Sequence, residues 1–433
     1  MEKLNIEQLN AIQTQTRITY VDAGAGTGKT TTLIARVIKC IKLGVKPWNI
    51  IVLAFNNKII EELKKKFTKE LGIKRAEKIN IYTIHGYARK VLGNRVVIKK
   101  ELFDEAIFET FVRKSWSKFK KINKLKGKNP KDTKDETSFV IDMVSKCREN
   151  NSNVKGYDEK YGLFYAAFKN ELKQNGAYDF ARLLKVAKNK LPQNTEPLYV
   201  FVDEFQDTSK ARFDFIKALV GNTNYLFAVG DEYQQILEWS GVKNVNVSRL
   251  KRHYKQELSI YKLTYSYRLT PQLAEISNGL LSFMSDRKTT KKLRGCNNAK
   301  FTFDTKKFNS QKKETEWCVN RINELVKKGV NHKNIGVLYR NSNVVDQAVI
   351  NTKAHCSTIH KAKGLEFDYV ILLGLEDGVF PSKNSNIEEE LRVLYVAITR
   401  AKKYLAITSL NDCYRNGVYV KGSSFLNILS NSI

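Results

Sequence analysis

Residues 23–30 have the sequence Ala-Gly-Ala-Gly-Thr-Gly-Lys-Thr, and this stretch decides the class of fold. Thr19–Ala23 precedes the glycines as a short strand-like segment. Thr31–Lys42 follows them, with apolar residues at the spacing of one helix face. The order is therefore strand, turn and helix, which is the arrangement that α/β proteins use to bind phosphate.

Each residue type in this turn suits a phosphate group. Glycines let backbone N–H groups approach phosphate oxygens, and the helix N-terminus adds the positive end of its dipole. Lys29 would reach the terminal phosphates of a nucleotide, and Thr30 would coordinate magnesium. The alternative is a plain glycine-rich turn, but Gly-Lys-Thr at a helix start favours phosphate. Ala23 stands where the strict pattern has glycine, so one position departs from it.

A cluster of acids follows a second buried strand. Tyr199–Val202 leads directly into Asp203-Glu204-Phe205-Gln206-Asp207. Ligands of open α/β sheets bind at the carboxyl ends of the strands. Asp203 would hold magnesium, directly or through water, and Glu204 would orient and deprotonate the attacking water. A solvated acidic loop is the alternative, and the phosphate loop elsewhere in the chain argues against it. Together the two segments predict magnesium-dependent nucleotide hydrolysis.

Composition limits the class of protein and its partners. The chain has 433 residues, of which 42% are hydrophobic, so it is long enough for two to four domains. Its net charge of +31 should attract polyanions and make nucleic-acid binding depend on salt, although a solvated lysine-rich surface is the alternative. No apolar run spans a membrane or resembles a secretion signal. We therefore expect a cytoplasmic protein, nucleoid-associated or in the host compartment if viral. Its six cysteines include no CxxC pair, so neither zinc nor an iron–sulfur cluster is expected.

Strands and helices alternate in two parts of the chain, which predicts an α/β fold with parallel sheets. Between about residues 90 and 195 the strand pattern gives way to long charged helices. In the first part we expect strands at Ile50–Phe55, Ile79–Tyr82, Leu198–Val202 and Tyr225–Val229. In the second part we expect strands at Phe301–Phe303, Ile335–Tyr339, Tyr369–Leu373 and Tyr404–Thr408, and helices at Pro271–Phe283, Lys313–Lys328 and Ile387–Arg400.

Several further segments stand in a fixed order around these two motifs. They are Leu4-Asn5-x-x-Gln8-x-x-Ala11, Ile51–Lys58 (IVLAFNNK), Tyr82–Gly86 (YTIHG), Ala228–Gly241 (AVGDEYQQILEWSG), Tyr265–Arg268 (YSYR), Ser357–Phe367 (STIHKAKGLEF) and Val393–Ala401 (VLYVAITRA). With the phosphate loop and the acids, the set resembles the superfamily 1A helicases of the UvrD/Rep/PcrA group. The resemblance extends from Leu4 to Leu426.

The resemblance implies two RecA-like parallel-sheet motor domains in tandem, with a helical 1B-type insertion in the first. The expected boundaries are 1–89 and 196–262 for motor domain 1A, 90–195 for the insertion, and 263–433 for motor domain 2A. Relatives carry a 2B subdomain where this chain has only a short join at 341–356, so 2B is predicted to be absent.

The resemblance also assigns roles in the nucleotide site. Gln8 would hydrogen-bond adenine, Tyr267 would stack on it, and Glu366 would lie near the ribose or the phosphates. Arg268 and Arg400 match arginine fingers, for which surface ion pairs are the alternative, and Gln234 would link the γ-phosphate to the DNA-binding surface. The predicted catalytic residues are Lys29, Asp203, Glu204, Gln234, Arg268 and Arg400. The predicted ATP-binding residues are Gln8, Ala23, Gly24, Ala25, Gly26, Thr27, Gly28, Lys29, Thr30, Thr31, Tyr267, Arg268, Glu366 and Arg400, with Thr30 and Asp203 as ligands of Mg²⁺.

A single-strand track needs aromatic faces for the bases and donors for the phosphates. Phe55 and Trp239 match the stacking positions of the family, although each would pass for a core residue if taken alone. Positions that contact the DNA backbone are matched by Asn57, Thr83, His85, Thr358 and His360. Three departures affect these sites: Leu237 replaces a frequent aromatic, Ser240 a frequent arginine, and Thr31 a frequent arginine after Gly-Lys-Thr.

The leading hypothesis is an ATP-dependent 3′–5′ single-stranded DNA translocase and helicase, acting in replication, repair or recombination with ATP and Mg²⁺. Its partners would be single-stranded and tailed duplex DNA, and it would act as a monomer. The alternative is the motor subunit of a nuclease–helicase assembly in repair or phage defence, which moves on DNA without unwinding it alone. A third reading, a basic scaffold with a degenerate motor, conflicts with the complete set of catalytic residues. RNA is left open, because phosphate and stacking contacts do not read the sugar.

Overall fold

The computed structural model describes residues 4–125, 130–152, 154, 156–236, 245–284, 291–383 and 385–430. These residues form two compact units. Unit 1 contains Met1–Tyr20, Thr30–Val229 and Leu237–Ile260. Unit 2 contains Val21–Lys29, Gly230–Ile236 and Tyr261–Ile433. The phosphate loop up to Lys29 is therefore grouped with the C-terminal half, whereas Thr30 and the acid cluster belong to unit 1. The domain boundaries expected from the family stay a prediction.

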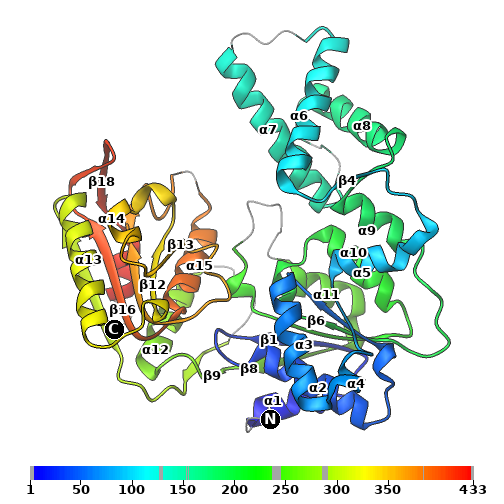
Figure 1. Cartoon of the computed structure of the whole chain (residues 1–433), viewed down its shortest axis with the longest axis horizontal. Coiled ribbons are helices and arrows are strands. Elements are labelled where there is room, and N and C mark those ends of the chain that lie inside the picture. Colours follow the sequence, from blue (N-terminus) through cyan, green and yellow to red (C-terminus); the bar gives the residue numbers. More distant parts are fainter. Residues whose placement is uncertain are drawn as a thin grey trace. The chain divides into compact units, whose positions relative to one another are not determined.

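A six-stranded sheet in the order β3-β2-β6-β7-β1-β8 organises the N-terminal half (Figure 1). β2 pairs in parallel with β3 and β6, and β6 pairs in parallel with β7. Its strands are β1 (Ile18–Ala23), β2 (Ile50–Ala54), β3 (Asn80–Thr83), β6 (Tyr199–Val202), β7 (Tyr225–Gly230) and β8 (Leu258–Leu263). The five strands expected here, which include Thr19–Ala23, are confirmed to within one or two residues at their ends.

Helices pack on this sheet through apolar faces. Leu53, Val202 and Phe205 belong to the core of unit 1. The α-helices are α1 (Ile6–Ile12), α2 (Lys29–Lys42), α3 (Asn57–Leu71), α4 (Ile73–Ala76), α5 (Ile84–Leu92), α10 (Lys210–Val220) and α11 (Asn246–Tyr254). The short 3₁₀ helices are η1 (Pro47–Asn49), η2 (Gly93–Arg95), η3 (Phe205–Asp207) and η6 (Lys255–Glu257). A further one, η4 (Glu232–Gln234), belongs to unit 2.

The stretch in which long helices were expected, between about residues 90 and 195, is mainly helical and has a core of its own. Figure 1 shows α6, α7 and α8 grouped together, and Trp116, Phe164 and Phe168 are buried among them. The elements are β4 (Lys100–Leu102), α6 (Glu105–Ile122), α7 (Pro130–Glu149), α8 (Glu159–Gln174), β5 (Ala177–Asp179) and α9 (Phe180–Lys188). The short parallel pair of β4 and β5 was not predicted, because three residues are too few to show an alternating pattern.

Unit 2 contains a five-stranded sheet in the order β11-β16-β14-β12-β13, in which every neighbouring pair is parallel. The four strands expected in this half are all present, and the three expected helices correspond to α12, α13 and α15. The strands are β11 (Thr302–Phe308), β12 (Ile335–Tyr339), β13 (His355–Thr358), β14 (Phe367–Leu373) and β16 (Ala401–Leu410). The helices are α12 (Pro271–Ser282), α13 (Gln311–Lys327), η7 (His332–Asn334), η8 (Ser342–Val344), α14 (Gln347–Ile350), α15 (Ile387–Ile398) and α16 (Ser424–Ser430).

Two smaller sheets complete this unit. One pairs β9 (Tyr265–Ser266) with β10 (Arg294–Gly295), and the other joins β15 (Glu376–Asp377), β17 (Cys413–Arg415) and β18 (Val418–Gly422). Within the described ranges no helix is long and apolar enough to cross a membrane.

The short join at 341–356 connects two neighbouring strands. β12 ends at Tyr339 and β13 begins at His355, and the two strands pair from Gly336 opposite His355 to Tyr339 opposite Thr358. Only η8 and α14 lie between them. The absence of a 2B subdomain stays a prediction, because it depends on what relatives carry at this position.

Candidate nucleotide and nucleic-acid sites

The phosphate loop requires glycine at two positions. Gly26 and Gly28 have φ angles of 71° and 80°, in the left-handed region that favours glycine. A Cβ atom on Gly26 would lie 2.5 Å from Cβ of Arg268 and 2.7 Å from Oγ of Ser266. Ala23, in contrast, is the last residue of β1, so the glycine of the strict pattern is not needed there.

The segment at Ser266–Tyr267 holds the loop by hydrogen bonds. Ser266 Oγ donates to the Ala25 carbonyl at 2.7 Å, and the Tyr267 N–H donates to the Gly26 carbonyl at 2.9 Å. Lys29 Nζ folds back on the loop and donates to the Gly24 carbonyl at 3.4 Å. The first turn of α2 contains no acidic residue, so its N-terminus keeps the positive potential that an anion needs.

In unit 1, Thr30 and the acid cluster meet. Thr30 Oγ1 donates to Asp203 Oδ2 at 3.1 Å, so the two predicted magnesium ligands converge. A hydroxyl and a carboxylate oxygen are donors that Mg²⁺ accepts, and this ion commonly uses one or two protein ligands together with phosphates and water. The described residues contain no group of three or more histidines, cysteines or acids that could hold a metal alone. Such a site therefore fits a magnesium that arrives with the nucleotide.

Glu204 has an unusual backbone immediately after β6. Its φ and ψ are both 48°, a left-handed conformation that residues other than glycine seldom adopt. Its N–H donates to Asp203 Oδ1 at 2.9 Å, and its Oε2 accepts a hydrogen bond from Gln206 Nε2. Strained residues of this kind persist only where the surroundings fix them, and they concentrate at active sites.

Asn246 supports the turn of the acid cluster through hydrogen bonds that the sequence did not predict. Asn246 Nδ2 donates to the carbonyls of Phe205, Gln206 and Thr208 at 3.2, 3.0 and 2.9 Å. Arg249 Nη1 then donates to Asn246 Oδ1 at 2.8 Å. An asparagine at the start of a helix is typical of a cap, so no pattern indicates that it reaches a turn some forty residues away.

In unit 2, two predicted catalytic residues contact each other although 166 residues separate them. Arg400 Nη2 donates to Gln234 Oε1 at 3.1 Å, and Gln234 Nε2 donates to Asp231 Oδ2 at 2.7 Å. Arg400 is 1% exposed, and its Nε and Nη1 donate to the carbonyls of Val396 and Leu365. The guanidinium is thus held by backbone acceptors, and one edge is directed at Gln234.

Arg268 pairs with another predicted nucleotide residue. Its Nε donates to Glu366 Oε2 at 2.8 Å, and Lys402 Nζ lies 2.5 Å from Glu366 Oε1. Burial would raise the pKa of Glu366, but the charges and hydrogen bonds of Arg268 and Lys402 hold it below its usual value. Tyr267 has 49% of its surface exposed, as a residue that stacks on a base requires.

Gln8 has a structural role that the sequence analysis did not consider. Its Oε1 accepts from the Asn5 N–H at 3.0 Å, and Asn5 Oδ1 accepts from the Gln8 N–H at 2.9 Å. This reciprocal capping box starts α1. The roles of Gln8 and of the half-buried Thr31 toward adenine stay predictions.

Phe55 directly follows β2, and its ring is exposed enough for a base to stack on it. It is 38% exposed, and the Arg212 guanidinium lies 5.3 Å from its ring centroid. Asn57 is exposed in the first turn of α3. Thr83 caps α5, where its Oγ1 accepts from the Gly86 N–H at 2.9 Å. Trp239, Leu237 and Ser240 lie outside the described residues, so the predictions for them stay predictions.

Both predicted DNA-contacting histidines are neutral. His85 stacks on Phe180 with ring centroids 4.0 Å apart, and burial, with a smaller contribution from Arg212, lowers its pKa well below 6.5. Burial and the nearby Arg340 lower the pKa of His360 to about 4. The Nε2 atom of each has no hydrogen-bond partner within the described residues. Near His360, Thr358 Oγ1 accepts from the Lys361 N–H at 3.4 Å.

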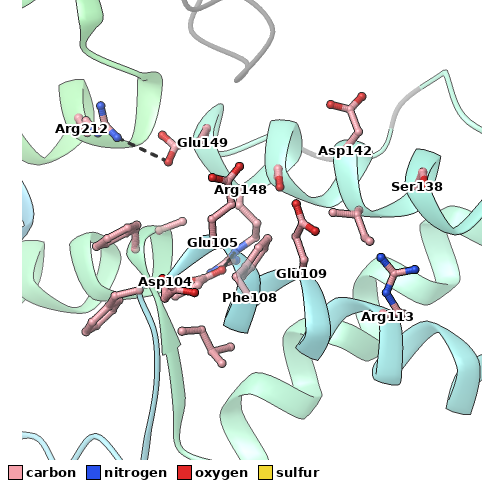
Figure 2. Close-up of a pocket in the computed structure, with 17 residues that line it drawn as sticks. Asp104, Glu105, Phe108, Glu109, Arg113, Ser138, Asp142, Arg148, Glu149 and Arg212 are labelled. Atoms are coloured by element: carbon pink, nitrogen blue, oxygen red, sulfur yellow. Dashed lines mark hydrogen bonds and ion pairs between the residues drawn. The ribbon is translucent and has the colours of Figure 1, made fainter. Parts of the chain in front are cut away.

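A pocket of about 530 Å³ in the helical insertion has the wrong charge for a nucleotide (Figure 2). Arg148 pairs with Asp179 through two hydrogen bonds of 2.5 and 2.6 Å, and Arg212 lies 3.9 Å from Glu149. Acidic side chains line it from several elements: Asp104, Glu105, Glu109, Asp142, Glu149 and Asp179. No residue of the phosphate loop or of the Asp203–Asp207 cluster lines it, so this pocket is not the ATP site.

Two family models match parts of this chain. The family described as UvrD/REP helicase N-terminal domain matches residues 4–255, and the UvrD-like helicase C-terminal domain matches residues 345–412. The chain belongs to the UvrD/REP helicase family. As a UvrD-like superfamily 1 protein with two RecA-like domains, it is an ATP-dependent DNA helicase by class.

Individual relatives of this UvrD-like helicase are also named as DNA helicases or probable DNA helicases. A probable DNA helicase of Mycoplasma pneumoniae is 28% identical over 99% of this chain and 87% of its own length. A probable DNA helicase II homolog of Mycoplasma capricolum is 30% identical over 78% of this chain. The ATP-dependent DNA helicase PcrA of Staphylococcus aureus is 26% identical over 78% of this chain. The chain spans about half the length of these last two, 49% and 48%.

Proposed function

We propose that this helicase is a 3′–5′ single-stranded DNA translocase that couples ATP hydrolysis to unwinding of tailed duplexes in replication, repair or recombination. The hydrogen bond between Arg400 and Gln234 supports this most, because it joins a predicted arginine finger to a predicted sensor of the γ-phosphate. The relatives named above are called a probable DNA helicase and the ATP-dependent DNA helicase PcrA, which supports DNA as the track.

The phosphates of ATP would bind the backbone of Gly24–Lys29, and Lys29 would exchange the Gly24 carbonyl for a terminal phosphate oxygen. Thr30 and Asp203 would hold Mg²⁺, which neutralises charge on the β- and γ-phosphates when it is bound. Glu204, held by Gln206, would orient the attacking water and accept its proton.

Two arginines would stabilise the transition state. Arg268 and Arg400 would neutralise the charge that develops on the transferred phosphoryl group, an effect of about 4–7 kcal/mol for arginine fingers. Arg268 would have to leave Glu366 in part, whereas Arg400 is already held in place by carbonyls. Closure on ATP and reopening after hydrolysis would convert this chemistry into steps along the strand.

The strand would be held without reading its sequence. Phe55 offers a half-exposed face for stacking, and each stacked base contributes about 1–3 kcal/mol. Because His85 and His360 are neutral, they would hydrogen-bond phosphates or sugars without adding charge. The net charge of +31 would supply the salt-dependent part of the affinity.

Unwinding of tailed duplexes tests the proposal. We expect ATP-dependent strand separation of a 3′-tailed DNA duplex, little on a 5′-tailed duplex, and less on matched RNA. Equal or greater unwinding of the 5′-tailed substrate would refute the polarity. DNA-stimulated ATPase without any unwinding would favour the second candidate.

That second candidate is a motor subunit whose partner, a nuclease or a replication or repair protein, uses the movement. The short join at 341–356 favours it, because it provides no further domain to contact duplex DNA. We propose a monomeric motor and a cytoplasmic, nucleoid-associated location. Affinity purification from native cells, followed by nuclease assays of the purified complex, would identify such a partner.

A further inference from the structure

A buried lysine joins two carboxylates that the proposed mechanism does not use. Asp22 lies in β1, directly before the phosphate loop, and Asp231 directly follows the neighbouring strand β7. Lys291 Nζ lies 2.6 Å from Asp22 Oδ1 and 2.9 Å from Asp231 Oδ1. None of the three side chains has any exposed surface.

Both carboxylates pair with the same buried cation. A buried charge is tolerated only when it is paired, and two neighbouring carboxylates repel each other. Burial would lower the pKa of Lys291, but Asp22 and Asp231 raise it, so the ammonium stays charged. Burial would likewise raise the pKa of Asp231, but Lys291 and then Lys29 hold it below its usual value. The three side chains therefore form a buried triad around the charged Lys291.

The triad determines which way the amide of Gln234 faces. An ionised carboxylate only accepts hydrogen bonds and a guanidinium only donates them. Asp231 Oδ2 accepts from Gln234 Nε2 at 2.7 Å, and Gln234 Oε1 accepts from Arg400 Nη2 at 3.1 Å. A flipped amide would put donor against donor at Arg400 and acceptor against acceptor at Asp231. The orientation is therefore set from both ends, by Arg400 and by the charge that Lys291 maintains on Asp231.

Lys291 is linked to the phosphate loop by a second route. Its Nζ lies 5.1 Å from the ring centroid of Tyr233, and that ring packs edge-on against Tyr395 at 6.0 Å. Tyr395 Oη in turn accepts from the Ala25 N–H at 3.4 Å. Lys291 is therefore connected to the phosphate loop at two places. Asp22 directly precedes the loop, and Ala25 lies within it.

We propose that Lys291 is a positioning residue for ATP hydrolysis, which fixes the amide of Gln234 between Asp231 and Arg400 and ties this chain of hydrogen bonds to the phosphate loop. The inference rests on the proposed ATPase function. Since Lys291 is not among the predicted nucleotide-binding residues, its loss should reduce turnover rather than ATP affinity.

A double-mutant cycle on the full chain tests this role. In DNA-stimulated ATPase assays we expect Lys291→Met to lower kcat roughly tenfold or more, with KM for ATP changed by less than about threefold. Lys291→Arg, which keeps a buried donor and its charge, should restore much of kcat. If Lys291 acts through Gln234, the variant K291M/Q234A should be no slower than Q234A alone.

A second buried triad in the same unit provides the matched control. Arg415 Nη2 lies 2.6 Å from both Glu314 Oε2 and Glu376 Oε1, and all three side chains are at most 3% exposed. Arg415→Met should lower the thermal unfolding temperature, as Lys291→Met does, without the loss of kcat. Its effect should also be independent of Q234A.

The results of these assays distinguish a positioning role of Lys291 from a purely structural one. Unchanged kcat in K291M, or multiplicative losses in K291M/Q234A, would overturn the inference and leave a structural role. A wild-type chain without DNA-stimulated ATPase would refute the proposed function and this inference with it. If K291M does not unfold cooperatively, Asp231→Asn replaces it, because that variant leaves Lys291 and Asp22 as a balanced pair. It should show the same loss of kcat and the same dependence on Q234A.

Discussion

At the scale of single residues, the predicted role of Glu204 as general base can be tested separately from its unusual backbone conformation. Glu204→Gln keeps the size and the partner Gln206 but removes the proton acceptor. We expect kcat to fall by about 10²–10⁴ while ATP binding is retained. ATPase assays and titration with a fluorescent nucleotide would measure both. The exposed Glu61 of α3 offers a control, and E61Q should be unaffected; a comparable loss there would disprove the assignment.

Lys29 should separate ATP hydrolysis from DNA binding. Lys29→Ala removes the cation predicted to bind the terminal phosphates, so DNA-stimulated ATPase should disappear. DNA affinity, measured by fluorescence anisotropy, should keep its steep dependence on salt because the net charge is nearly unchanged. Lys39→Ala, in the last turn of the same helix, should retain ATPase. If K29A still hydrolyses ATP, the phosphate-loop assignment is wrong.

His360 should make stability depend on pH. Its folded-state pKa of about 4 lies below the ordinary value of 6.5, so the unfolded chain binds more protons between these two values. The free energy of unfolding should therefore fall as pH decreases from 6.5 to 4, and His360→Gln should reduce that slope. Urea unfolding at several pH values would measure it. The same slope in wild type and variant would contradict the prediction.

At the scale of elements, α11 supports the acid cluster through Asn246. Asn246→Ala removes three hydrogen bonds to carbonyls of the turn, and we expect it to cost about 1–3 kcal/mol of stability and to lower kcat. Asn224 is a matched control, because it bridges the Leu219 carbonyl and the Leu198 N–H in the same unit. N224A should lose stability but keep kcat per folded molecule. Equal kcat losses in both variants would mean a general effect of destabilisation.

The strands and helices could be predicted where the pattern is local. Largely buried strands such as β2 and β6 show as apolar runs, and the phosphate loop shows as glycines before a helix. β8 was missed because its exposure is uneven along the strand, unlike that of the fully buried β1 and β2. Asn246 and Lys291 were missed because their partners lie far away in the chain, and spacing carries no information about such contacts.

At the scale of the whole molecule, the short join at 341–356 leads us to expect translocation without dimerisation. Relatives are expected to carry a 2B subdomain at this position. Stopped-flow fluorescence on single-stranded DNA of several lengths would measure the rate. The rate per bound molecule should not depend on protein concentration. Activity that begins only above a threshold concentration would show that a second copy is required.

The paired strands at the base of the helical insertion bear on how such a chain can change over time. Lys100 lies opposite Ala177, so the segment leaves and returns at one place, and its core is its own. A segment anchored in this way can be lengthened, shortened or exchanged by recombination without altering the register of the neighbouring sheet. We therefore expect relatives to differ more in the length and sequence of α6–α8 than in the residues of the nucleotide site.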